Sequence, residues 1–153
     1  MIVLSLLIGF VAGLRAMTAP AAASWAAYLG ALPLEGTWLA VLGYAWTPWI
    51  LTLLAVVELG TDQLPGMPSR MVPVQFGTRI VTGGIAGAAF GSPSGSLLLG
   101  AVAGAVGAIL GTVGGAAARG RLARAFGRDL PAALVEDAVA IGCLAVLVIV
   151  VVL

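Results

Sequence analysis

Charged residues are rare in this chain, and their positions indicate which chemistry it could perform. Among 153 residues there are seven arginines and six acidic residues, with no lysine and no histidine. Arg15 falls inside a long apolar segment, where an arginine costs roughly 2.5 to 3.5 kcal/mol on membrane-insertion scales. Such a charge is retained when it faces the interior of a helix bundle and meets a carboxylate, a backbone carbonyl or a ligand. Arg15 is therefore the first candidate for a functional position.

Several carboxylates are placed where they could meet this arginine. Glu58 and Asp62 are four residues apart, so on a helix they share one face. Glu136 and Asp137 lie near the start of the last apolar segment, and Arg79 lies near the start of the third apolar segment at a similar depth. The predicted solute- or ion-binding site consists of Arg15, Thr18, Glu58, Asp62, Arg79, Glu136 and Asp137.

Three interpretations of this charge cluster stay open. In the first, the charges neutralise one another and only fix the register of the helices. In the second, the carboxylates carry protons or a cation while Arg15, near the N-terminus of a half-helix, holds an anion, as in a transporter. In the third, the acids bind a hard divalent metal in an enzyme that acts on lipid. The third is the weakest, because the chain lacks histidine and a serine-nucleophile motif. We expect no enzyme and no cofactor, and leave metal binding open.

The composition points to lipid as the solvent. Hydrophobic residues make up 61% of the chain and charged residues 8%, whereas soluble domains carry roughly 25% charged residues. The net charge of +1 gives no argument for nucleic-acid binding. The single cysteine, Cys143, lies in an apolar run, which excludes a disulfide framework and a cysteine-based metal site.

The apolar segments predict an all-α bundle of about five transmembrane spans, forming one domain over residues 1–153. Each segment can cross the roughly 30 Å of bilayer hydrocarbon. The arginines outside the spans all fall on one side, which the positive-inside rule makes cytoplasmic. The N-terminus is then cytoplasmic and the C-terminus periplasmic. The predicted spans are residues 2–29, 37–61, 72–91, 96–118 and 131–153.

Two of these segments are too long to be simple spans. Residues 2–29 would measure about 42 Å as one helix, and Pro20 favours a break near Thr18. The fourth pattern continues to residue 126 and is predicted to be interrupted at 111–115. Two interrupted helices of opposite direction would suggest an inverted-topology repeat with a site near the midplane. The alternative is that the pieces after the interruptions, such as residues 119–128, are interfacial amphipathic helices.

Glycines recur at four-residue spacing within residues 83–91 and 100–115. In lipid, small residues drive helix association because they let backbones approach closely. The glycine stripes therefore predict tight helix packing. So small a bundle also leaves much of its surface uncovered, which predicts a homo-oligomer, with a dimer as the simplest case.

Five short motifs in a fixed order together resemble the bacterial membrane proteins grouped as domain of unknown function 4126. The resemblance covers nearly the whole chain, although Gln63 stands where many members have lysine. It implies a polytopic membrane protein and supplies no established activity. The motifs are GLRAMTAP at 13–20, the Glu58–Asp62–Pro65 segment, PSR at 68–70, Arg79 with its following glycines, and LVED at 134–137.

These observations predict a small protein of the bacterial inner membrane that acts as a transporter or as a channel-like protein. Its expected partners are the lipid bilayer, a small polar or ionic solute and a second copy of itself, and no nucleic acid. The alternative function is a structural or partner-binding membrane protein whose buried charges only fix helix packing.

Overall fold

The computed structural model describes residues 1–61 and 71–152 of the chain. Asp62, Gln63 and Arg70 lie outside the described residues. Within that part of the chain every regular element is a helix, which confirms the all-α prediction. The elements are α1 (Ile2–Leu14), α2 (Thr18–Tyr28), η1 (Trp38–Gly43), α3 (Thr47–Thr61), α4 (Pro73–Gly91), η2 (Ser92–Ser94), α5 (Leu97–Phe126) and α6 (Asp129–Val152).

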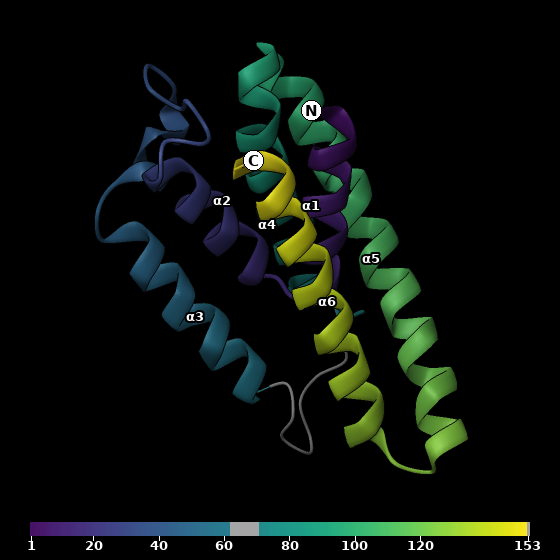
Figure 1. Cartoon of the computed structure of the whole chain (residues 1–153). Coiled ribbons are helices and arrows are strands. Elements are labelled where there is room, and N and C mark those ends of the chain that lie inside the picture. Colours follow the sequence, from purple (N-terminus) through teal and green to yellow (C-terminus); the bar gives the residue numbers. More distant parts are fainter. Residues whose placement is uncertain (62–70, 153) are drawn as a thin grey trace.

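The first predicted span is two helices, and the chain reverses between them. α1 ends at Leu14, and Arg15 takes an extended backbone conformation with φ −141° and ψ 109°. α2 begins at Thr18, which confirms the break predicted there. Pro20 lies in the first turn of α2, where its missing N–H costs no helical hydrogen bond. α1 runs from the end of the molecule marked N toward its middle, and α2 returns toward the same end (Figure 1).

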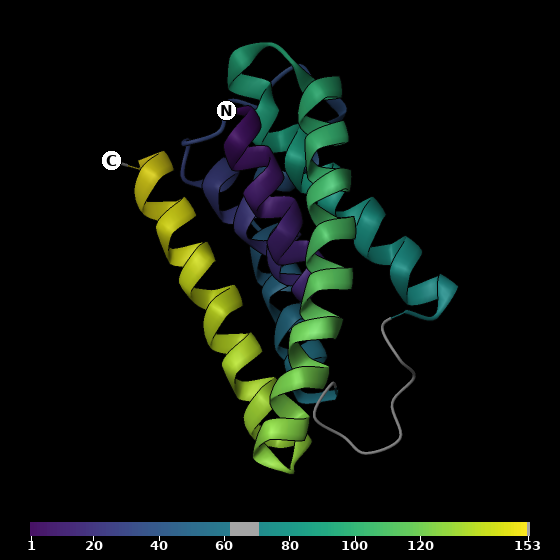
Figure 2. The same cartoon turned by 90° about the vertical axis from the view of Figure 1, so that its right-hand side faces the viewer.

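This reversal changes the path of the chain. The Ser92 hydroxyl donates to the Pro33 carbonyl at 3.1 Å, so the loop after α2 lies beside the turn between α4 and α5. The start of α1 and the end of α6 lie toward one end of the molecule in both views (Figures 1 and 2). Five full crossings would place the two ends of the chain on opposite sides. The five-span prediction is therefore not confirmed.

The second predicted interruption is wrong, because α5 is continuous over 30 residues. No proline falls within it, and Gly100, Gly104, Gly107 and Gly111 pack against the neighbouring helices α4 and α1. α1 and α5 also run in the same direction, since Gly107 approaches Leu6 while Gly111 approaches Gly13. An inverted repeat of two interrupted helices is thus absent from the described residues. α5 and α6 are the two helices among them that are long and apolar enough to cross a membrane.

The glycine stripes hold α1, α4 and α5 together, as the sequence predicts. A Cβ atom built on Gly104 would collide with the Gly83 carbonyl oxygen on α4 and lie 2.8 Å from the Cα atom of Gly87. A Cβ atom on Gly9 of α1 would collide with the backbone of Gly104 from another side. The three helices therefore make close backbone contact, and they form the rigid core on which the other elements are placed.

The remaining helices lie around this core. The segment predicted as the second span is divided: η1 precedes α3, which begins at Thr47 with Pro48 in its first turn. α3 lies beside α2, where the Trp25 indole N–H donates to the Thr52 hydroxyl at 2.9 Å. α6 begins at Asp129, two residues before the predicted boundary, and lies against α5 and α1.

Candidate functional site

The break between α1 and α2 exposes unsatisfied backbone groups, and charged side chains bind them. Helix C-termini leave carbonyl groups without partners and N-termini leave N–H groups. From α4, Arg79 Nη1 donates to the carbonyl oxygens of Gly13 at 2.8 Å and Leu14 at 2.6 Å. From α3, the Glu58 carboxylate accepts the backbone N–H groups of Ala16 and Met17, both at 2.8 Å. The cation thus lies at the negative end of α1 and the anion at the start of α2, as helix dipoles favour.

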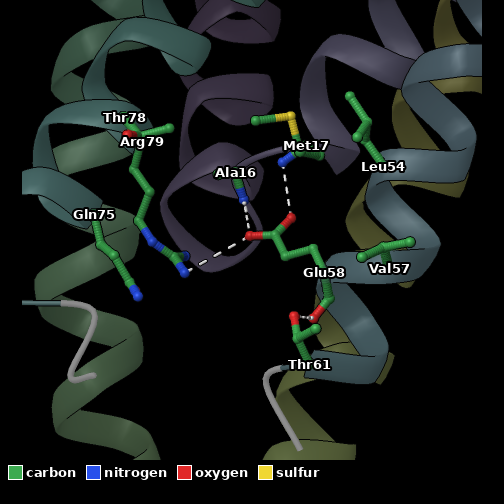
Figure 3. Close-up of a pocket in the computed structure, with 9 residues that line it drawn as sticks. All are labelled: Ala16, Met17, Leu54, Val57, Glu58, Thr61, Gln75, Thr78 and Arg79. Carbon is green, nitrogen blue, oxygen red and sulfur yellow. Dashed lines mark hydrogen bonds and ion pairs between the residues drawn. The ribbon is translucent and has the colours of Figure 1, made fainter. Parts of the chain in front are cut away.

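Glu58 and Arg79 are also an ion pair, with Arg79 Nη2 3.8 Å from Glu58 Oε1. Their side chains are 14% and 3% exposed, so the pair lies mostly inside the protein. Glu58 is on α3 and Arg79 on α4, two helices connected in the chain by residues 62–72. Both side chains reach the break from opposite sides (Figure 3). We name this pair, with the backbone groups it binds at residues 13–17, the helix-break clamp.

Arg15 lies within the break and pairs with a different acid. It is fully buried, and its Nε donates to Asp137 Oδ1 of α6 at 2.7 Å. Its Nη2 bonds to the same oxygen. The guanidinium therefore turns inward to a carboxylate, as the cost of an exposed charge in an apolar segment predicts.

Glu136, the neighbour of Asp137 in sequence, faces another arginine. Arg119 of α5 has its Nη1 3.7 Å from Glu136 Oε2 and donates from Nε to Asp129 Oδ1 at 2.9 Å. The site predicted from the sequence contains Glu136 together with Arg15 and does not include Arg119. Successive residues point about 100° apart around a helix, so Asp137 can reach Arg15 while Glu136 turns toward Arg119.

Thr18 and Asp62 are the remaining residues of the predicted site. Thr18 is the first residue of α2, and its buried hydroxyl has no hydrogen-bond partner in the part of the chain that is described. Asp62 lies outside that part.

Thr112, missed from the sequence, is fully buried with its hydroxyl 2.8 Å from the Ala108 carbonyl and 3.2 Å from that of Gly13. The signal in the sequence is a lone hydroxyl within a glycine-rich segment, the same segment that predicts an interruption of the helix.

A pocket of about 280 Å³ opens beside the helix-break clamp (Figure 3). Glu58 and Arg79 lie on its wall with polar side chains that sequence reasoning missed, Gln75 and Thr78 of α4 and Thr61 of α3. Gln75 is four residues before Arg79 on one helix face, so that spacing could have indicated it. The lining residues are Ala16, Met17, Leu54, Val57, Glu58, Thr61, Gln75, Thr78 and Arg79.

No protein-family model, curated protein or solved structure matches this chain. The resemblance to the domain of unknown function 4126 family therefore stays a prediction. Within residues 1–61 and 71–151, no three side chains of histidine, cysteine, aspartate or glutamate are grouped in a way that could hold a metal ion. The chemistry of the described site is that of paired charges, helix ends and an adjoining pocket whose wall combines apolar side chains with Thr61, Gln75 and Thr78.

Proposed function

We propose that this chain is an integral protein of the bacterial inner membrane that moves a small polar or ionic solute through the pocket beside Glu58 and Arg79. Two kinds of observation support the membrane part. α5 and α6 have the length and composition of membrane-crossing helices. Large apolar side chains such as Leu53, Leu98 and Ile149 are exposed over several helices, and soluble monomers rarely expose large contiguous apolar patches.

The positions of the arginines suggest an orientation. Four of the seven fall between residues 119 and 128, at the end of α5 and the turn into α6. The positive-inside rule makes that turn cytoplasmic. The start of α1 and the end of α6 lie toward the opposite end of the molecule (Figures 1 and 2). Both termini are then periplasmic in this proposal, which replaces the expectation of a cytoplasmic N-terminus because α1 and α2 reverse.

The observation that carries the transport proposal is that the polar pocket borders the charged ends of a broken helix. Transporters commonly bind solutes where broken helices direct their ends at a cavity. Each oxygen of a carboxylate can accept more than one hydrogen bond. Glu58 can therefore hold the start of α2 and still interact with a solute in the pocket. Gln75 and Thr78 add neutral polar groups from α4.

Flux measurements in proteoliposomes test this proposal. The panel is Na⁺, K⁺, Cl⁻, acetate and protons, each measured with purified full-length protein. Glu58→Gln should reduce the flux of the transported solute to the level of empty liposomes, because the pocket loses its negative charge. The protein should still fold, since glutamine keeps one acceptor oxygen for the N–H groups before α2 and Arg79 keeps its two backbone carbonyl partners. The matched control is Glu35→Gln, in the exposed loop after α2, which should transport normally.

A second variant keeps the test decisive if Glu58→Gln fails to fold. Gln75→Leu removes a polar group from the pocket wall without altering the helix-break clamp, and it should lower flux. Normal flux in folded Glu58→Gln, or in Gln75→Leu when the first variant is unfolded, contradicts the proposal. Absence of flux through the wild-type protein for every member of the panel also contradicts it.

The alternative function, a structural lock, is favoured by one observation. Arg15 and Asp137 are paired in the interior, and Arg15 is fully buried. A buried pair of this kind can fix the register of α6 against the helix break without any solute. The two functions differ in whether water reaches the pocket beside Glu58.

A further inference from the structure

The cytoplasmic end proposed for α5 carries three exposed arginines. Arg121 and Arg124 lie on α5 three residues apart, so they share one face of the helix. Arg128 lies in the turn before α6, just after Gly127 ends α5 with a φ of 66°. The structure gives none of these three an ion-pair partner among residues 1–61 and 71–151.

Nearby acids do not cancel this charge. Asp129 and Glu136 are the acidic residues of the first turns of α6, and both interact with Arg119. Arg119 is mostly buried, with a side chain 17% exposed, and it directs its guanidinium toward α6. The exposed arginines therefore leave an excess of positive charge at this end of the molecule. We name Arg121, Arg124 and Arg128 the arginine tip.

The surroundings of the arginine tip suit a membrane surface. Phe126 and Leu130 lie beside it in the chain and are both exposed. Arginines next to exposed apolar side chains are the combination that binds at the boundary between headgroups and acyl chains. A helix of 30 residues is about 45 Å long and exceeds the roughly 30 Å of hydrocarbon. The turn between α5 and α6 also lies at the extreme end of the molecule in both views (Figures 1 and 2).

We infer that the arginine tip binds the headgroups of anionic phospholipids. The inference rests on the membrane placement in the proposed function, and it does not depend on transport. A guanidinium donates two parallel hydrogen bonds to a phosphate, which makes arginine well suited to this headgroup. Each arginine near an anionic surface contributes roughly fivefold to the affinity. The inner leaflet of a bacterial membrane would thus anchor the end of the longest helix.

Native mass spectrometry of the full chain in detergent micelles tests the inference. The micelles are doped with phosphatidylglycerol or, at the same mole fraction, with phosphatidylcholine. Wild-type protein should retain phosphatidylglycerol well above phosphatidylcholine. The triple variant Arg121→Gln, Arg124→Gln, Arg128→Gln should lose that preference by on the order of 100-fold. The matched control carries lysine at the same three positions and should retain most of it, since the charge remains.

Other outcomes overturn the inference. Equal retention of the two lipids by wild type, or unchanged phosphatidylglycerol binding in the glutamine variant, removes the arginine tip as a lipid site. Inorganic phosphate that displaces phosphatidylglycerol at an equal headgroup concentration shows a site for free phosphate. The Glu58→Gln protein separates the two proposals: it should lose flux and keep its phosphatidylglycerol, so a failure of transport leaves the lipid site standing.

Discussion

Arg15 and Asp137 form a buried ion pair that joins the helix break to α6. Both are removed from solvent, and Arg15 donates to a single carboxylate oxygen of Asp137 from Nε and Nη2. A buried pair of this kind need not add net stability compared with well-packed apolar residues. Loss of one partner is much more harmful, because it leaves a buried charge without compensation.

Each single substitution in this pair should therefore destabilise the protein strongly, and the double substitution should destabilise it by less than the sum of the two. Arg15→Leu and Asp137→Asn are each expected to lower the free energy of unfolding by about 3 to 5 kcal/mol. The double variant should recover part of the loss, giving a coupling free energy in a double-mutant cycle. Denaturant unfolding in detergent measures all four proteins, with exposed Arg124→Leu as a control expected within about 0.5 kcal/mol of wild type. Strictly additive losses would show that the two side chains do not interact.

The sequence predicts that Arg15 turns inward, but it does not identify the partner. The inward orientation follows from the cost of a charge in an apolar segment. The partner depends on the rotation of α6 about its own axis, which sequence spacing does not determine. Glu136 and Asp137 are adjacent, yet Asp137 accepts hydrogen bonds from Arg15 while Glu136 lies within ion-pair distance of Arg119. Glu58 likewise binds backbone amides, and nothing in its sequence surroundings indicates those partners.

Among the helices, the contact between α4 and α5 is set by glycines and should tolerate no added methyl group. Gly104→Ala would place a Cβ against the Gly83 carbonyl and the Gly87 Cα atom. Overpacking of this kind costs about 1 to 3 kcal/mol, or more when backbone must move. Gly114→Ala, on the same helix, meets nothing within 4 Å and should be neutral or stabilising by up to about 1 kcal/mol.

Melting temperatures of the two alanine variants in the same detergent compare these effects directly. Both replace a glycine in α5 by alanine, so the gain in helix propensity is shared and only the contact differs. An equal change in melting temperature for Gly104→Ala and Gly114→Ala would mean that the glycine contact does not hold α4 against α5.

The helix boundaries show which elements a sequence can specify. The break at Arg15 was predictable because Pro20 and the excessive length both disfavour a continuous helix. The predicted interruption of α5 was wrong because Gly111, Gly114 and Gly115 resemble breakers in sequence. In the structure, Gly111 packs against Phe10 of α1, and this tertiary contact favours a continuous helix over a break. Glycine alone therefore does not distinguish a hinge from a close helix contact.

In the whole molecule, the direction of α2 is the feature with the largest consequence. A sequence shows that a helix ends, but it does not show whether the next one continues or returns. Here the helix-break clamp holds the end of α1 with Arg79 and the start of α2 with Glu58. α2 then lies beside α3 and away from the path of α1 (Figure 1). One reversal moves the N-terminus to the same end as the C-terminus and places the polar pocket next to the break.

The proposed function requires that water reach the pocket beside Glu58 and Arg79, and the reactivity of a cysteine on the pocket wall measures this access. The measurement uses Met17→Cys in a Cys143→Ala background, reconstituted in liposomes and labelled with a charged, water-soluble thiol reagent. Only the thiolate reacts, and it forms in contact with water. We expect fast labelling of Met17→Cys and very slow labelling of Val106→Cys, which replaces an exposed valine on the apolar surface of α5. Equally slow labelling at both positions, in folded protein, would show that water does not reach the pocket, which contradicts the proposed function.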